Sequence, residues 1–234
     1  MTYQCYSRRF GLPLVITILS TSLLSAGCSN DTGSKKQNVP TPAIQKSSNI
    51  PINIFGIDRS GSTARMREQQ KAVVTAGFIF AGKRREKVGV YVVDSKSAPV
   101  FSVREISKRE RPLDSVLKEF DTVTSVRGSR TRPSAFWKQM SDDYAASNPT
   151  IRIRINYVTD GDNDWAMDAR KINEYINRLS QNPNVYIALI GLDKDQVEQL
   201  KKQFRPFGER CTFSIGTDQG EMIDAVSSLR LLGN

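Results

Sequence analysis

The sequence predicts an α/β fold with a doubly wound, mostly parallel sheet of six strands, one antiparallel edge strand, and helices on both faces. Two observations support this prediction. From Ile50 onward, short apolar runs rich in β-branched residues alternate with segments whose apolar residues recur at helical spacing, which is typical of strands joined by crossover helices. One pair of runs, 87–94 and 100–106, is separated only by a short turn, which indicates an antiparallel hairpin.

The expected elements follow one another in the order that such a sheet requires. The first strand, within 50–57, is apolar and β-branched, so it suits a position covered on both faces. A long helix is expected from about Thr63 to Gly82, and the hairpin comes next. Two helices then begin at Pro112 and Pro133. The remaining elements are a strand over 151–158, a helix that stops at 182–183, a strand over 185–192, a helix over 197–204, a strand over 212–215 and a helix around 222–229.

Composition limits both the size of the fold and its chemistry. A chain of 234 residues with 38% hydrophobic residues can form one α/β domain with appendages. The chain has no histidine, which excludes Ser-His-Asp and Cys-His catalysis and histidine-bound zinc. The formal net charge is +10, but 24 acidic residues are interspersed among 34 basic ones. This mixture favours an ordinary solvated surface over a nucleic-acid partner.

Residues 1–27 have the features of a secretory signal peptide. Arg8 and Arg9 precede an apolar run over 12–24, which is too short for a comfortable transmembrane helix. The run ends in Leu-Leu-Ser-Ala-Gly-Cys, which resembles the lipobox of bacterial lipoproteins. The resemblance implies that Cys28 is lipidated and becomes the first residue after cleavage.

Residues 28–49 are polar and punctuated by proline, so we expect a flexible tether that spans roughly 25 Å on average. Residues 50–234 are then the folded domain, held at a membrane of the cell envelope on its periplasmic or extracytoplasmic face. Once Cys28 carries lipid, Cys211 has no disulfide partner, and burial near a strand is the expectation for it.

The first expected strand ends in a group of oxygen-bearing side chains. Asp58, Ser60 and Ser62 follow it at steps of two, and Gly61 lets the backbone bend before the helix begins. In an open parallel sheet, loops at the carboxyl ends of the strands line the crevice where ligands usually bind. One carboxylate and two hydroxyls favour Mg²⁺ or another hard divalent cation. By itself, this loop is equally well explained as a turn in which Ser62 caps the helix.

Two later loops are expected at the same edge of the sheet. Thr131 precedes the helix opened by Pro133, and Thr159-Asp160-Gly161 ends the strand over 151–158. This order of Asp-x-Ser-x-Ser, a later threonine and Thr-Asp-Gly resembles the metal-ion-dependent adhesion site of von Willebrand factor A domains, over about residues 50–234. The resemblance implies Mg²⁺, with Mn²⁺ or Ca²⁺ as alternatives, and Ser129 as an alternative to Thr131. The implied ligands are Asp58, Ser60, Ser62, Thr131 and Asp160, the last acting directly or through water.

The resemblance also implies a function in protein binding. In the family, the cation captures an Asp or Glu of a protein partner, so we expect an adhesion or scaffold module and not an enzyme, with no nucleic acid and no small-molecule substrate. Arg59, Arg130 and Arg132 are expected at the rim, where they would steer an acidic partner.

Two other functions fit parts of the sequence. One is a metal-dependent phosphoesterase, although Ser60 stands where haloacid-dehalogenase-like phosphatases have a second aspartate. The other is a scaffold of the same fold that no longer binds metal. A nucleotide-binding protein is disfavoured because the chain lacks a glycine-rich phosphate loop.

Overall fold

The computed structural model describes residues 49–106, 112–122, 131–161 and 164–232. The expected signal peptide, Cys28 and nearly all of the expected tether therefore lie outside the described residues. Residues 46–234 form one compact unit. The apolar cores of the described part of the chain are formed by residues of this unit, so we expect it to fold without the segment that precedes it. No helix among the described residues is long and apolar enough to cross a membrane.

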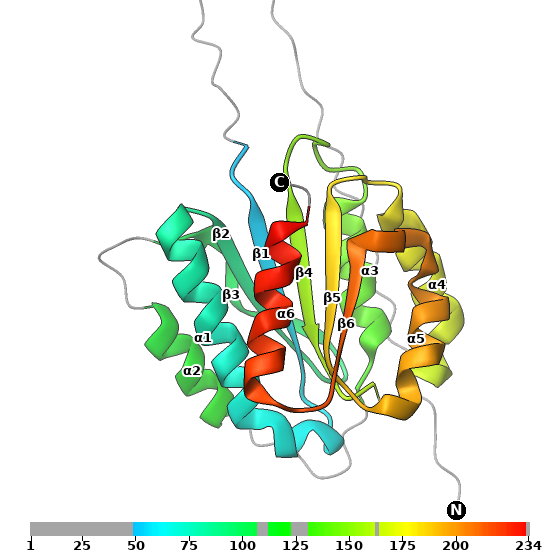
Figure 1. Ribbon diagram of the computed structural model, residues 1–234, viewed down its shortest axis with the longest axis horizontal. Coiled ribbons are helices and arrows are strands. Elements are labelled where there is room, and N and C mark those ends of the chain that lie inside the picture. Colours follow the sequence, from blue (N-terminus) through cyan, green and yellow to red (C-terminus); the bar gives the residue numbers. More distant parts are fainter. Residues whose placement is uncertain (1–48, 107–111, 123–130, 162–163, 233–234) are drawn as a thin grey trace, which may run out of the picture. The chain divides into compact units, whose positions relative to one another are not determined.

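A six-stranded sheet runs through the middle of the domain (Figure 1). The strand order is β3-β2-β1-β4-β5-β6. Only the β2–β3 pair is antiparallel, which confirms the predicted fold class and its antiparallel edge strand. The strands are β1 (Ile52–Asp58), β2 (Lys87–Val93), β3 (Ser97–Glu105), β4 (Ile153–Val158), β5 (Val185–Leu192) and β6 (Cys211–Ile215).

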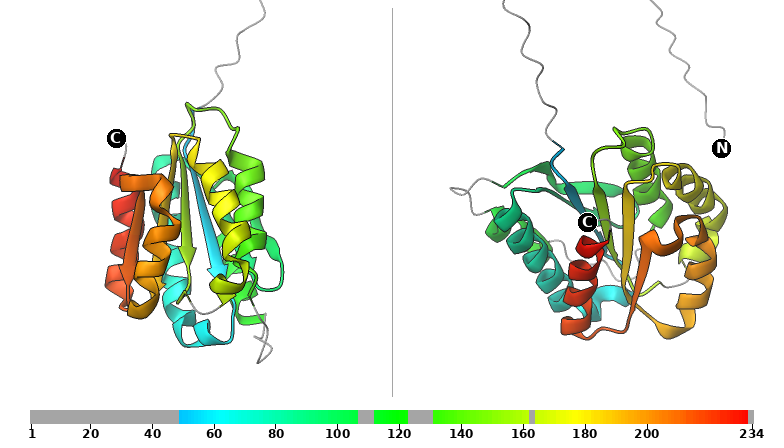
Figure 2. Two further views of the ribbon diagram at one scale, coloured as in Figure 1. Left: turned by 90° about the vertical axis from the view of Figure 1, so that its right-hand side faces the viewer. Right: turned by 45° about the horizontal axis from the view of Figure 1, so that its top comes forward.

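Helices cover both faces of this sheet, and Figure 2 shows α1 and α6 on one side and α3 and α4 on the other. The first layer consists of α1 (Arg67–Arg84), α2 (Pro112–Thr122) and α6 (Gln219–Leu231). The second layer consists of α3 (Pro133–Tyr144), α4 (Asp164–Ser180) and α5 (Val197–Gln203). Short 3₁₀ helices complete the fold: η1 (Ser62–Met66), η2 (Lys194–Gln196) and η3 (Arg205–Arg210).

The first helix differs from its expected bounds at both ends. It begins as the 3₁₀ turn η1 and becomes α-helical only at Arg67. It also continues past Gly82 to Arg84, because a single glycine inside a long helix weakens it by only about 1 kcal/mol. Arg85 then ends the helix in a left-handed conformation with φ of 56°, and its N–H donates to the Ala81 carbonyl. The basic run after position 82 therefore begins within the last helical turn.

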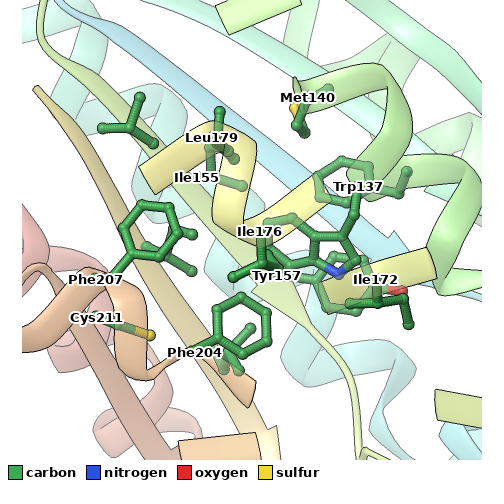
Figure 3. Packing of buried hydrophobic residues seen from close by; sticks show 14 of the residues in the cluster. Trp137, Met140, Ile155, Tyr157, Ile172, Ile176, Leu179, Phe204, Phe207 and Cys211 are labelled. Atoms are coloured by element: carbon green, nitrogen blue, oxygen red, sulfur yellow. The ribbon is translucent and has the colours of Figure 1, made fainter. Parts of the chain in front are cut away.

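The second helical layer packs on an aromatic core (Figure 3). The ring of Trp137 lies 5.5 Å from that of Tyr157 and 5.1 Å from that of Phe204, measured between centroids. Cys211 is buried at the edge of this core, as expected, and burial raises the pKa of its thiol. The core under α1 and α6 is mostly aliphatic. With both faces covered, the carboxyl ends of the parallel strands are left for the loops that hold the candidate site.

Candidate metal site at the carboxyl ends of the strands

Asp58, the last residue of β1, is the residue that joins the three loops. Its side chain is 3% exposed. The Thr131 hydroxyl donates to Asp58 Oδ1 at 2.9 Å, and the Ser60 backbone N–H donates to the same oxygen at 2.9 Å. The Thr159 hydroxyl donates to Asp58 Oδ2 at 2.7 Å. All three loops that the sequence placed at this edge therefore meet at one carboxylate.

The two serines of the first loop extend this cluster toward solvent. Ser60 Oγ and Ser62 Oγ lie 2.9 Å apart. Ser60 is 7% exposed, whereas Ser62 is only partly buried. The oxygen cluster therefore has a buried side at Asp58 and a more open side at Ser62.

Two buried side chains that the sequence analysis did not single out hold this loop in place. Thr63 Oγ1 lies 2.9 Å from the Asp58 carbonyl oxygen and 3.0 Å from that of Ser60. The Gln70 side-chain amide donates to the Asp58 carbonyl at 2.8 Å and is 1% exposed. Gln70 could have been recognised as a polar residue on the apolar face of α1, four residues after Met66 and three before Val73.

Asp160 lies next to the cluster, at the end of β4. It is 1% exposed, and its carbonyl accepts a hydrogen bond from the Asp193 N–H at 2.9 Å. Thr159 just before it is fully buried, and its hydroxyl accepts from the Gly161 N–H at 3.0 Å while it donates to Asp58. Thr159 belongs to the Thr-Asp-Gly motif, although the sequence predicted no role for it; its position directly before Asp160 was the available signal.

The electrostatics of the cluster suit a bound cation. Burial raises the pKa of Asp58 to about 6, although hydrogen bonds from Ser60, Thr159 and Thr131 act to lower it. The negative charge of Asp160 raises it further. Two buried carboxylates close enough to influence each other, surrounded by hydroxyl oxygens, form an all-oxygen donor set of the kind that hard divalent cations prefer. The residues present therefore fit such an ion.

One of the arginines expected at the rim of the site is buried instead. Arg59 is 2% exposed, so its predicted place at the rim is wrong. Its N–H still bonds to the Val93 carbonyl at 2.8 Å, which continues the sheet by one residue and keeps the side chain within the domain. Arg132 is exposed, as expected. Arg65 is a further basic residue near the open side of the cluster. It shares a face with Ser62, because side chains three residues apart on a 3₁₀ helix lie above one another. Its guanidinium binds both carboxylate oxygens of Asp193 at 2.9 Å.

Two expected residues cannot be placed, because Ser129 and Arg130 lie outside the described part of the chain. Over the residues that are described, no three Asp, Glu, Cys or His side chains gather in a group able to hold a metal. The predicted ligand set differs from such a group, since it combines two carboxylates with three hydroxyls. Metal binding by these residues stays a prediction.

Solved structures of other proteins resemble this domain in fold. A von Willebrand factor type A protein from Catenulispora acidiphila is 12% identical with a TM-score of 0.55, over 79% of this chain and 43% of that one. BatB from Bacteroides thetaiotaomicron is 12% identical with a TM-score of 0.54, over 77% and 98%. The pilus adhesin SpaC from Lactobacillus rhamnosus GG is 12% identical with a TM-score of 0.55, over 77% and 30%.

These likenesses concern the fold alone. No protein-family model matches the sequence, and no curated protein matches it significantly. The chain spans less than half of the Catenulispora protein and of SpaC but nearly all of BatB. The sheet order, the single antiparallel edge strand and these structural neighbours agree: the domain has the von Willebrand factor A fold.

Proposed function

We propose that this domain is a divalent-cation-dependent binding module that captures an acidic side chain of a protein partner. The observation that supports this most directly is the meeting of three loops at the Asp58 carboxylate. The residues that would hold the cation are Asp58, Ser60, Ser62, Thr131 and Asp160. When bound, the cation would supply a Lewis-acidic position for a carboxylate of the partner.

The hydrogen bonds of the cluster are compatible with this role. A hydroxyl has one donor and two acceptor lone pairs. Thr131 can therefore donate to Asp58 and still offer lone pairs to a cation. Thr159 contributes differently: its hydroxyl donates to Asp58 and accepts from Gly161, so it orients the carboxylate from the buried side. The partly exposed Ser62 marks the side from which a partner would approach.

Adhesion and scaffolding agree with some of the structural neighbours. SpaC is described as a pilus adhesin, and PilB of Streptococcus sanguinis, with 11% identity and a TM-score of 0.54, as a minor pilin. At such low identity these neighbours support a binding role only by analogy of fold. We also infer, from the features of residues 1–28, that a lipid on Cys28 anchors the domain to a membrane of the cell envelope.

Calorimetric titration of Mg²⁺, Mn²⁺ and Ca²⁺ into the metal-stripped domain 46–234 tests the metal site. We expect saturable binding by the wild type and its loss in Asp58→Ala. The matched control is Asp224→Ala, which removes an exposed carboxylate of α6, and it should bind as the wild type does. Failure of the wild type to bind any of the three ions would contradict the proposal.

The partner is then sought by comparing proteins captured with and without chelator, using wild type and Asp58→Ala in parallel. A binding module should also fail to hydrolyse generic phosphate esters. Metal-dependent turnover that disappears in Asp58→Ala would instead support the phosphoesterase alternative.

A further inference from the structure

A basic surface lies at the end of the sheet opposite the oxygen cluster. Helices α1 and α6 both end there, and β1 begins there (Figure 1). Lys83, Arg84 and Arg85 follow one another at the end of α1, and all three are exposed. Within the described part of the chain, none of them forms an ion pair with an acidic side chain.

A pocket with apolar walls adjoins these cations. Its volume is about 260 Å³, and it lies between the ends of α1 and α6. Leu231 at its edge is 67% exposed. The guanidinium of Arg230 lies 5.2 Å from the centroid of the Phe80 ring, but it is committed to a buried ion pair with Glu86. The cations at this end that are free to meet a ligand are therefore Lys83, Arg84 and Arg85. We call these three residues and Leu231 the basic end.

Helix termination explains only part of this arrangement. Positive charge is favourable near the carboxyl end of a helix, which accounts for Lys83 and Arg84. It does not account for an exposed leucine beside them. Nor does it account for Arg85, which takes the left-handed conformation that glycine adopts with less strain.

We propose that the basic end binds the headgroups of anionic membrane lipids. Lys and Arg side chains would contact phosphate groups, and Leu231 would enter the apolar boundary beneath them. The place where the chain enters the domain favours a membrane over other anionic partners. Asn49 lies three residues before the start of β1, and its side-chain oxygen accepts a hydrogen bond from Thr150 at 3.0 Å, at this same end of the sheet.

The consequence for orientation rests on the proposed lipid anchor at Cys28. A tether that leaves from the basic end would bring that end to the membrane, and the oxygen cluster at the other end of the strands would then point away from it. One lipid chain binds a membrane more firmly when a basic patch acts with it. The basic end would thus serve as the second attachment and would present the metal site to partners.

Vesicle co-sedimentation of the domain 46–234, which lacks the lipid, tests the contact itself. We expect binding to vesicles that contain phosphatidylglycerol, no binding to pure phosphatidylcholine, and weaker binding as salt rises. The triple variant Lys83→Ser, Arg84→Ser, Arg85→Ser should bind roughly 100-fold more weakly. Leu231→Ser should weaken binding by about threefold to tenfold at constant charge.

The matched control removes three other exposed lysines, on α4 and α5: Lys171→Ser, Lys201→Ser, Lys202→Ser. It has the same net charge as the first triple variant and should sediment as the wild type does. An equal loss in both triple variants, or no loss in the first, would overturn the proposal. Displacement of the domain from vesicles by soluble glycerol phosphate would also overturn it, in favour of a site for a free phosphate compound.

The two proposals fail separately. Cation titration of the first triple variant should match that of the wild type, which also shows that the variant is folded. Loss of vesicle binding in the triple variant, with cation binding intact, would support lipid binding by the basic end. If the wild type bound vesicles but no cation, only the proposed metal site would be rejected.

Discussion

Two buried polar clusters lie at opposite ends of the same strands, and they differ in how their charge is compensated. At one end, the hydrogen bonds described for the Asp58 carboxylate come from hydroxyls and a backbone amide, all of them neutral groups. At the other end, the Glu86 carboxylate binds two guanidinium groups, those of Arg154 at 3.4 Å and Arg230 at 2.5 Å, and the Asn53 amide at 2.7 Å.

The difference separates a structural cluster from a binding cluster. Glu86, Arg154 and Arg230 are each at most 5% exposed, so the Glu86 charge is compensated inside the domain by cations of the chain itself. Desolvation lowers the pKa of Arg154, and the Glu86 charge acts against that shift. The Asp58 cluster instead places a second carboxylate, Asp160, next to the first. A buried site that gathers negative charge is suited to a cation from outside the chain.

The largest expected effect is at the structural cluster. Glu86→Ala leaves two buried guanidinium groups without their common carboxylate, so the free energy of unfolding should fall by about 3–5 kcal/mol. Urea unfolding in the presence of chelator measures it. Glu68→Ala is the control, because Glu68 forms an exposed ion pair with Lys71 and should change stability by less than about 1 kcal/mol. Similar small losses in both variants would refute the distinction drawn between the two clusters.

Asp58→Asn should act in the opposite direction. The pKa of Asp58 is raised from 3.8 to about 6, so its ionisation opposes folding increasingly as the pH rises from about 4 to about 6, and fully above that range. At neutral pH, the amide should therefore stabilise the metal-free domain by about 1–3 kcal/mol. The same variant should lose any stabilisation by Mg²⁺.

Unfolding midpoints of wild type and Asp58→Asn, each with chelator and with Mg²⁺, measure both effects in one experiment. A less stable metal-free Asp58→Asn would mean that the carboxylate is retained for the hydrogen bonds that it accepts and not for a cation.

The smallest effect tests the residue that the sequence analysis overlooked. Thr159→Val keeps the shape of the buried side chain but removes the hydrogen bonds to Asp58 and from Gly161, so the metal-free domain should lose about 1–2 kcal/mol. Mg²⁺ affinity should fall roughly tenfold, because a group that orients a ligand is lost. Thr159→Ser retains the hydroxyl and should stay close to wild type in both measurements; equal losses in the two variants would assign the effect to packing.

Local sequence patterns were sufficient for the elements of the fold. Apolar runs with β-branched residues marked the strands, and the short turn between β2 and β3 identified the antiparallel edge. The boundaries were less accurate: β3 begins at Ser97, three residues before the expected position, and α1 runs past Gly82. Polar or flexible residues at the end of an element do not reveal whether hydrogen bonds continue through them.

For the site, the sequence predicted which loops would meet, because the carboxyl ends of parallel strands share one edge. It did not predict which polar side chains would be buried together. Arg59 appeared to belong to an exposed loop, yet it continues the pairing with β2 and is buried. Gln70 and Thr159 appeared ordinary, yet both contact Asp58.

By itself, the sequence determined the fold class, the order of strands and helices, and the edge at which Asp58, Thr131 and Asp160 lie, because periodicity and turn residues act over a few neighbouring positions. Only the tertiary structure decided the hydrogen-bond partners. Thr159 and Asp58 are 101 residues apart in the chain, and Arg230 and Glu86 are 144 apart. Such contacts depend on which strands and helices become neighbours. Because these polar groups are buried away from water, each needs a hydrogen-bond or ion-pair partner within the protein.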